Sequence, residues 1–433
     1  MDKIRIFGGN KLIGKVIISG SKNATLPIMI SSLLTDKKLT LDNVPKLADI
    51  LTLNKILSEL GCKVSSLWDG GGSSQGLIRS EGILELECSE MKTNIADYQY
   101  VSKMRASFLV LGPLLGRCGY AKVSMPGGCA IGIRPIDQHL YGLKKLGAKI
   151  SIDGGYIVAE AKNGLVGNRI KLRKNSVGAT QNIIMAAVLA RGESLIENAA
   201  QEPEIEDMVN CLKKMGLKID GAGTKNIIIQ GTNRSSIEGA HHTVMADRIE
   251  AGTYATAVCM TGGKLELVNF SPKLLETPFK ILNDIGCDIK IFEDSALIER
   301  DDKKLSPVNI ITKSYPGFPT DLQAQFMALL THASGESVIS EKIFENRFMH
   351  VQELVRMGAD IKLVGDKAII SGKADLLGAQ VMATDLRASV SLVIAALVAK
   401  GETTINRVYH LDRGFEKLEE KISACGGMIE RIN

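Results

Sequence analysis

Aromatic residues and long apolar runs are scarce in this chain. Only 4% of its 433 residues are aromatic, and tryptophan occurs once. The longest apolar run, residues 390–399, is about half of the ~18–20 residues that a membrane-spanning helix needs. The first residues, MDKIRIFGGNKLIGKV, carry charges where a signal peptide requires an apolar stretch. These absences predict a cytoplasmic protein without a membrane partner.

Signatures of metal, disulfide and nucleic-acid chemistry are missing as well. The eight cysteines form no C-x-x-C pair and have no histidine at metal-ligand spacing, so we expect free thiols, mostly buried, and no bound metal. The net charge of +5 comes without dense Lys/Arg runs, which argues against nucleic acid as a partner. Neither a GxxxxGK[ST] loop nor a GxGxxG fingerprint is present, so no nucleotide is held by those motifs.

Glycine, in contrast, is abundant at 43 residues, and part of it marks an internal repeat. Six segments resemble the pattern L-x-x-h-G-x-x-h, where h is apolar, and their glycines lie 68 to 86 residues apart. Each segment predicts an amphipathic helix that ends at the glycine and leads into a short strand. A unit of roughly 70 residues therefore recurs six times. The glycines are Gly61, Gly147, Gly216, Gly286, Gly358 and Gly426.

The first interval is the widest, and its surplus falls around Trp68 among Gly and Ser residues, which predicts a surface loop insertion.

A second set of six helices is apolar on nearly every side, which predicts burial on every side. Strands follow most of them, so the fold class is α/β, with sheets that wrap internal helices. Six units divide most simply into two domains of three, and the chain crosses between them within residues 233–245. The first strand, about residues 4–19, fits either domain. The alanines aligned at the helix starts are Ala24, Ala106, Ala179, Ala251, Ala324 and Ala388.

Four of these internal helices begin beside a cation, although the helix dipole disfavours Lys or Arg there by ~0.3–1 kcal/mol each. Any one of the side chains could simply extend into solvent. At four equivalent positions we favour anionic ligands in a shared cleft, where free backbone N–H groups, dipole and cation act together. The four residues are Lys22, Arg105, Arg248 and Arg387.

Acidic residues mark some of the same helix starts. Simple N-capping explains Asp247 and Asp385. Asp321 instead heads a helix that has no cation in its start motif, and it follows the turn GFPT. A carboxylate placed near cations and anionic substrates is a candidate general base.

Residues 126–135 are rich in Gly and Pro and predict a loop that contains Cys129 close to Arg134. These surroundings favour an exposed, functional thiol, as nucleophile or as proton donor. His139 follows soon after and fits a structural role as well as a catalytic one. Arg347 and Arg413 lie at equivalent positions of the repeat, 66 residues apart, where surface ion pairs are the alternative to ligand binding.

Many of these segments resemble the enolpyruvyl transferases, and within them the UDP-N-acetylglucosamine 1-carboxyvinyltransferase family. The matching motifs are SGSKNATLP, VPKLAD, MRAS, PGGCAIGIRP, SVGAT, ENAAQEPEIED, FPTDLQAQF, FENRFMHV, GAQVMATDLRAS and YHLDRG, which span essentially the whole chain. The resemblance implies a two-domain inside-out α/β barrel with three repeats in each domain and the active site in the interdomain cleft. It implies an N-terminal domain of residues 22–244, and a C-terminal domain of residues 1–21 and 245–433 that includes the first strand.

The resemblance also implies an activity: the enolpyruvyl group of phosphoenolpyruvate is transferred to the 3-hydroxyl of UDP-N-acetylglucosamine, through a tetrahedral ketal and with release of phosphate. This is the first committed step of peptidoglycan biosynthesis, carried out by a cytoplasmic enzyme, here taken as a monomer, that needs no cofactor. Cys129 would donate a proton to C3 of the enolpyruvate, and it would be the target of the epoxide fosfomycin. Asp321 would take the proton of the sugar hydroxyl.

Substrate-binding positions carry over residue by residue from the family's motifs. Lys22, Asn23, Arg134 and Arg413 would hold the phosphate of phosphoenolpyruvate, and Lys22 and Arg413 would also take part in catalysis. Arg347 and Arg387 would hold the carboxylate of phosphoenolpyruvate. The UDP-sugar and the remaining substrate contacts would involve Arg105, Arg134, Pro135, Ile136, Asp137, Gln138, Lys174, Asn175, Ser176, Val177, Asp321, Ile343 and Asp385.

Two other functions compete with this one. The sister enzyme that acts on shikimate 3-phosphate shares the fold and much of the arginine set, but the PGGC loop and the stretch KNSVGAT argue against it. A non-catalytic repeat protein that binds a polyanion leaves the thiol loop and Asp321 unexplained.

Overall fold

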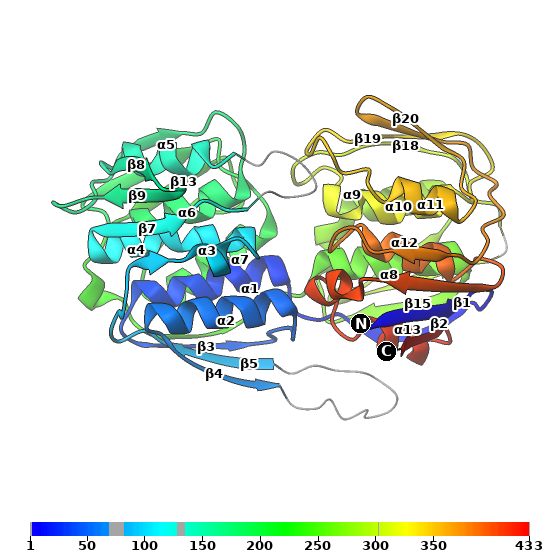
Figure 1. The fold of residues 1–433 in the computed structure, drawn as a ribbon, viewed down its shortest axis with the longest axis horizontal. Coiled ribbons are helices and arrows are strands. Elements are labelled where there is room, and N and C mark those ends of the chain that lie inside the picture. Colours follow the sequence, from blue (N-terminus) through cyan, green and yellow to red (C-terminus); the bar gives the residue numbers. More distant parts are fainter. Residues whose placement is uncertain (1, 69–81, 128–134, 302, 433) are drawn as a thin grey trace.

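Two halves lie side by side in the molecule, and in each half strands surround a set of helices (Figure 1). The computed structural model describes residues 2–68, 82–127, 135–301 and 303–432. Both chain ends lie in the same half (Figure 1). Cys129 and Arg134, two of the predicted site residues, lie outside the described residues.

Six four-stranded sheets formed by the described residues make up the walls, and they share one pattern: one strand pair at an edge of each sheet is parallel, and the other two pairs are antiparallel. The recurrence confirms the six-fold repeat. The three sheets of the first half, in spatial order, are β14 (Ala240–Thr243), β3 (Lys38–Asp42), β5 (Gly82–Glu87) and β4 (Lys63–Trp68); β6 (Ile95–Ala96), β7 (Tyr120–Ser124), β9 (Tyr156–Glu160) and β8 (Lys149–Asp153); and β10 (Arg169–Lys171), β11 (Glu193–Glu197), β13 (Asn226–Gln230) and β12 (Lys218–Asp220).

The second half repeats this arrangement with strands from both ends of the chain. Its sheets are β16 (Asp288–Ile291), β17 (Ser295–Arg300), β15 (Gly263–Val268) and β2 (Leu12–Ile17); β18 (Asn309–Ile311), β19 (Ser337–Ser340), β21 (Lys367–Ile370) and β20 (Ile361–Val364); and β22 (Gln380–Met382), β23 (Glu402–Asn406), β1 (Lys3–Phe7) and β24 (Met428–Ile432). The single first strand expected over about residues 4–19 is two strands: β1 pairs with the last two strands, β23 and β24, whereas β2 pairs with β15.

Each half has internal helices that are buried along almost their whole length, as their all-round apolar sequences predict. In the second half, α8, α10 and α12 contact one another. The internal helices are α1 (Lys22–Ser31), η2 (Arg105–Val110) continued by α4 (Leu111–Cys118), α6 (Val177–Ala187), α8 (Arg248–Thr261), α10 (Gln323–Leu330) and α12 (Ser389–Ala396).

Six outer helices bury one face, and each is followed by the glycine of the repeat, all six with positive φ values between 87° and 117°. This left-handed conformation ends the helix at little cost in glycine. The outer helices are α2 (Ala48–Leu60), α5 (Asp137–Lys145), α7 (Pro203–Lys214), α9 (Glu276–Ile285), α11 (Val351–Arg356) and α13 (Leu418–Ala424). The short helices are η1 (Ser32–Leu34), α3 (Tyr98–Val101), η3 (Arg234–Ser236), η4 (Pro272–Leu275), η5 (Thr320–Leu322) and η6 (Val408–Arg413).

Two separate hydrophobic clusters form the cores. One gathers buried side chains from residues 24–244, and the other from residues 4–18 and 249–429. The chain passes between them twice, and the two passages pair at a bridge between Gly20 and Ala246. A Cβ atom at Gly20 would lie 1.7 Å from the carbonyl oxygen of Asn43, so the close approach of the residue that follows β3 requires glycine there.

The predicted loop insertion falls on residues 69–81, outside the described residues. Its flanks, β4 and β5, form an antiparallel hairpin in which Trp68 lies opposite Gly82. The indole Nε1 of Trp68 donates to the carbonyl oxygen of Val44 at 3.2 Å.

The prediction of free thiols is wrong for one pair of cysteines. Cys259 near the end of α8 and Cys287 just after α9 form a disulfide, because these two helices pack together and bring their Cα atoms to 6.0 Å. The free cysteines within the described residues are Cys62, Cys88, Cys118, Cys211 and Cys425, of which only Cys118 is exposed.

Within the same residues, every helix is too short or too polar to cross a bilayer. They also contain no group of three or more His, Cys, Asp or Glu side chains placed to hold a metal ion.

Candidate active site

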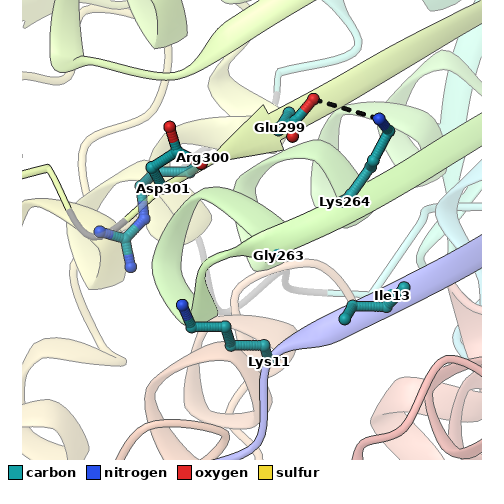
Figure 2. Close-up of a pocket in the computed structure, with 7 residues that line it drawn as sticks. All are labelled: Lys11, Ile13, Gly263, Lys264, Glu299, Arg300 and Asp301. Atoms are coloured by element: carbon teal, nitrogen blue, oxygen red, sulfur yellow. Dashed lines mark ion pairs between the residues drawn. The ribbon is translucent and has the colours of Figure 1, made fainter.

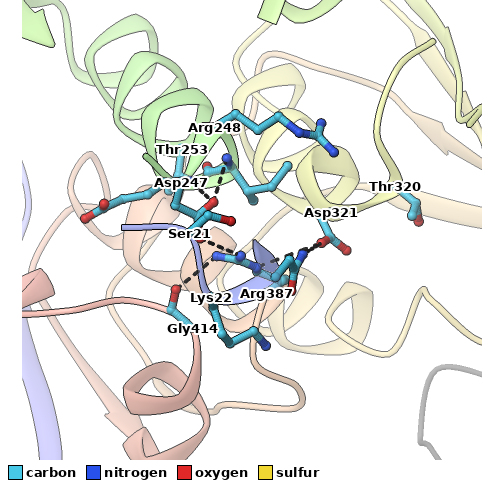
Figure 3. Close-up of polar contacts among 12 residues, drawn as sticks. Ser21, Lys22, Asp247, Arg248, Thr253, Thr320, Asp321, Arg387 and Gly414 are labelled. Carbon is cyan, nitrogen blue, oxygen red and sulfur yellow. Dashed lines mark hydrogen bonds and ion pairs between the residues drawn. The ribbon is translucent and has the colours of Figure 1, made fainter. Parts of the chain in front are cut away.

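The candidate site forms where internal helices of both halves begin. Lys22 opens α1 in the first half, while Asp321 lies in η5 before α10, and Arg387 precedes α12 in the second half. Figure 3 shows Arg387 between Asp321 and Asp247, with Lys22 beside it. The predicted gathering of charged residues at helix starts is therefore found for these three.

Asp321 is the carboxylate at the centre of this cluster. Its Oδ1 accepts from Nη2 of Arg347 at 2.7 Å, and its Oδ2 lies 3.9 Å from Nε of Arg387. The side-chain amide of Asn23, from the first half, donates to Oδ2 at 3.5 Å. Three predicted substrate-binding residues thus surround the predicted base.

The cations around Asp321 keep it ionised. Burial alone would raise its pKa, but Arg347, Arg387 and Lys22 together hold the pKa of this carboxyl well below its usual range. Asp321 is therefore a carboxylate at neutral pH, which is the form that a general base requires.

Arg387 is almost fully buried and is held on several sides. Its Nη2 pairs with Oδ2 of Asp247 at 2.8 Å, and its Nη1 donates to the carbonyl oxygen of Gly414 at 2.9 Å. Its guanidinium also lies over the ring of Phe415, 5.3 Å from the centroid. Asp247 uses its other oxygen to cap α8, which confirms the predicted N-cap and ties Arg387 to the helix start.

Arg347 is buried in the same way, so the alternative of a surface ion pair is wrong for it. Its Nη1 donates to Oγ1 of Thr320 at 2.9 Å. That hydroxyl donates in turn to Glu341, which also accepts the backbone N–H of Ile343 at 2.8 Å. Glu341 thereby fixes Ile343, a predicted sugar contact, relative to Arg347.

A second pair of cations lies at the other side of the cluster. Lys22 Nζ lies 3.3 Å from Oδ2 of Asp49, and Arg413 Nε donates to Oδ1 of Asp49 at 2.7 Å. Lys22 is buried, and burial is the main cause that lowers its pKa, whereas Asp49 raises it. Two of the three predicted phosphate-binding cations, Lys22 and Arg413, therefore share one carboxylate.

The stretches predicted to contact the UDP-sugar lie beside each other at the starts of α5 and α6. Gln138 Oε1 accepts the backbone N–H of Arg173, the residue before Lys174, at 2.8 Å. Ser176 caps α6 by accepting the backbone N–H of Ala179. The remaining members of the two stretches are Pro135, Ile136, Asp137, Asn175 and Val177, of which Pro135, Asp137 and Asn175 are exposed.

His139 lies just behind these stretches and has a structural environment. It is buried, its Nδ1 lies 3.1 Å from Nδ2 of Asn182, and it meets the ring of Phe108 edge to face. Burial, assisted by the charge of nearby Arg105, lowers its pKa to about 3. The neutral ring fits the structural alternative better than the catalytic one.

Two predicted residues have other partners in this structure. Arg248 pairs with Glu204 through Nε at 2.9 Å, while Asp321 acts on Arg248 through its charge. Asp385 accepts the backbone N–H groups of Arg387 and Ala388, both at 2.8 Å, in the turn before α12; the N-cap of α12 itself is Ala388, so the prediction that Asp385 caps this helix is wrong.

Asp49 and Thr320 lie within two of the motifs that carry the family resemblance, VPKLAD and FPTDLQAQF, but neither was predicted as a site residue. Glu341 stands in a polar stretch outside the matched motifs. Only long-range contacts reveal what these three side chains do.

A cavity elsewhere is no part of this site. It has a volume of about 380 Å³ and lies at the ends of β2, β15 and β17, lined by Lys11, Ile13, Gly263, Lys264, Glu299, Arg300 and Asp301 (Figure 2). Lys264 is already paired with Glu299, and Arg300 donates to the carbonyl oxygen of Lys303. None of the predicted site residues lies in this cavity.

Comparison with known proteins places the whole chain in one family. The model of the family described as EPSP synthase (3-phosphoshikimate 1-carboxyvinyltransferase) matches residues 6–422. The chain belongs to the enolpyruvyl transferase family. Relatives from Xanthobacter autotrophicus and Chelativorans sp., both named UDP-N-acetylglucosamine 1-carboxyvinyltransferase, are each 55% identical to it over 433 residues, which cover 100% of both chains.

Solved structures of enolpyruvyl transferases share the fold. The enolpyruvyl transferase NikO from Streptomyces tendae superimposes with a TM-score of 0.86 at 23% identity, covering 99% of this chain and 98% of its own. EPSP synthase from Acinetobacter baumannii gives a TM-score of 0.75 at 16% identity, with 100% of both chains covered. At these identities the likeness concerns the fold alone, and it agrees with the predicted two-domain α/β class.

Proposed function

We propose that this enzyme transfers the enolpyruvyl group of phosphoenolpyruvate to the 3-hydroxyl of UDP-N-acetylglucosamine and releases phosphate. The observation that carries the proposal is the carboxylate of Asp321, ionised and surrounded by cations that can bind a second, incoming anion. Full-length relatives at 55% identity bear the name of this activity, which supports the choice of acceptor.

In this proposal the two groups of cations bind the two anionic ends of phosphoenolpyruvate. Lys22 and Arg413, with Asn23 and Arg134, hold the phosphate. Arg347 and Arg387 hold the carboxylate, for which planar guanidinium groups are suited by bidentate geometry. The substrate carboxylate would then share the arginines that Asp321 pairs with in the free protein.

The UDP-sugar would lie along the starts of α5 and α6 and reach Asp321 from there. The adjacency of Gln138 and Arg173 supports one continuous surface for the nucleotide. The UDP-sugar would contact Arg105, Arg134, Pro135, Ile136, Asp137, Gln138, Lys174, Asn175, Ser176, Val177, Asp321 and Ile343. Asp385 would lie near the carboxylate end of phosphoenolpyruvate.

The proposed reaction is an addition followed by an elimination. Asp321 takes the proton of the sugar hydroxyl, the hydroxyl oxygen bonds to C2 of phosphoenolpyruvate, and C3 receives a proton from Cys129 to give a tetrahedral ketal. C3 then loses a proton, the bond from C2 to the phosphate oxygen breaks, and the double bond returns. Fixed cations stabilise the charge that develops on the leaving phosphate.

Domain limits, cellular role and inhibition complete the proposal. The domains would be residues 22–244, and residues 1–21 with 245–433, which the two separate hydrophobic clusters support. The reaction would be the first committed step of peptidoglycan biosynthesis, in the cytoplasm, by a monomer.

Fosfomycin would be opened at its epoxide by the Cys129 thiolate, which forms a C–S bond as a C–O bond breaks.

The test is release of inorganic phosphate from phosphoenolpyruvate with UDP-N-acetylglucosamine, with shikimate 3-phosphate, or with neither. We expect release only with the UDP-sugar, and its loss after fosfomycin treatment or in Cys129→Ser. Cys118→Ser, which changes an exposed free cysteine, is the matched control and should keep full activity. Release with shikimate 3-phosphate alone, or no release with either acceptor, would contradict the proposal.

A further inference from the structure

Asp49 occupies an unusual position for a carboxylate. It lies in the first turn of α2 and is only 4% exposed. Its two oxygens contact Lys22 of the first half and Arg413 of the second. One buried side chain thus joins two cations whose own elements belong to different hydrophobic cores.

Helix capping does not account for this carboxylate. The N-cap position of α2 is Leu47, and no side chain caps this helix within the described residues. A buried carboxylate is costly unless charges or donors compensate it, and the compensation present here is the pair of cations. Asp49 is therefore placed to pair with these two cations and hold them in position.

Asp49 is the main group that favours the charged form of Lys22. The charged groups that act on Lys22 are Asp49 and Asp321, which favour the ammonium, and Arg387 and Arg413, which oppose it. Burial opposes it as well and is the largest cause, and Asp49 is the largest favourable one.

We propose that Asp49 is the positioning residue for the phosphate end of the site. It holds Lys22 and Arg413 side by side. Contact between the two halves is thereby coupled to assembly of the site for a phosphomonoester dianion. The inference rests on the proposed function, since it assigns the phosphate to these cations. Asp247 does the equivalent for Arg387, but both of those residues lie in the second half.

The experiment compares steady-state kinetics of the wild type with Asp49→Asn, which removes the charge and keeps the shape. We expect KM for phosphoenolpyruvate to rise about tenfold or more while KM for the UDP-sugar changes less than about twofold. The alkaline limb of kcat/KM for phosphoenolpyruvate should move to lower pH, because Lys22 loses its ammonium more easily. Asp49→Glu should restore part of both effects.

Glu204→Gln is the matched control, since it also removes a buried carboxylate that pairs with a cation of the other half. It should change neither the alkaline limb nor KM for phosphoenolpyruvate by the amount seen in Asp49→Asn. Thermal unfolding of each variant, and calorimetric binding of inorganic phosphate, separate a local effect from loss of the fold.

The inference is overturned if Asp49→Asn binds inorganic phosphate as the wild type does and keeps both KM and the alkaline limb, even where its melting temperature falls. A wild type that releases no phosphate with the UDP-sugar would instead contradict the proposed function. Weakened binding of inorganic phosphate in Asp49→Asn would then still support the assembly of a phosphate site by Asp49.

Discussion

At the scale of single residues, the site consists of charges that the protein itself balances. Asp321 is balanced by Arg347 and Arg387, and the latter also pairs with Asp247. Each arginine has a second anchor, since Arg347 is held by Thr320 and Arg387 by the carbonyl oxygen of Gly414. Such cations keep their positions when one partner is exchanged for a substrate anion.

These second anchors lead to a prediction for Asp321→Asn. The variant should fold, because both arginines keep their other partners, but kcat should fall by about 10²- to 10⁴-fold because the general base is gone. Phosphate release measures the rate, and circular dichroism with thermal unfolding checks the fold.

Asp375→Asn, in an exposed ion pair with Lys400, is the control and should keep its kcat. Retention of more than about a tenth of the wild-type kcat in Asp321→Asn would remove Asp321 from the role of base.

At the scale of elements, a buried ion pair joins three segments near the passages between the halves. Lys421 of α13 donates to Glu250 of α8 and to the hydroxyl of Ser19, which follows β2, all at 2.7 Å. The backbone N–H of Ser19 donates to the same carboxylate, also at 2.7 Å. Both charged side chains are 3% exposed, so neither has water as an alternative partner.

This arrangement predicts a large effect of Lys421→Met on stability. The change leaves the carboxylate of Glu250 buried without its cation, which should cost about 3–5 kcal/mol of the free energy of unfolding. The double variant Glu250→Gln with Lys421→Met should recover part of that loss, because no buried charge remains. Urea unfolding of the two single variants and the double variant measures the coupling.

A loss below about 1 kcal/mol in Lys421→Met would mean that water or another cation reaches Glu250. The exposed pair of Lys38 and Glu85 provides the comparison, since Lys38→Met should cost well below that amount.

At the scale of the whole molecule, each half contains a buried histidine that stays neutral. Burial is the main cause that lowers the pKa of His139 to about 3 in the first half and that of His350 to about 4 in the second. The ordinary value of 6.5 applies once the chain unfolds. Between these values the unfolded chain binds more protons than the native one, so native stability falls as the pH falls.

The prediction is a loss of stability on acidification from pH 6.5 toward pH 4, to which each histidine contributes up to about 1.4 kcal/mol per pH unit. His139→Gln and His350→Gln should each flatten this slope, whatever they do to the stability at pH 7. Urea unfolding at several pH values measures the slopes. An unchanged slope in both variants would show that the two rings are protonated in the native protein.

Much of the architecture could be predicted because it repeats. Six helix-ending glycines and six apolar helices recur along the chain, and such periodicity needs no knowledge of distant contacts. The cations at helix starts were informative for the same reason, since the dipole makes them locally unfavourable. Arg387 lies 3.9 Å from Asp321, and Lys22 acts on it through its charge, whereas Arg248 takes Glu204 as its ion-pair partner.

The sequence by itself determined the division into internal and outer helices and the charged helix starts, because each follows from residues within one or two turns of one another, and it determined the repeat because these local patterns recur along the chain. Only the tertiary structure decided which charges meet. Asp49 lies 27 residues from Lys22 and 364 from Arg413, yet it contacts both. The disulfide between Cys259 and Cys287 likewise depends on how two helices pack. Such pairings depend on how the six similar units pack together. The sequence of one unit does not show which other unit its side chains will contact.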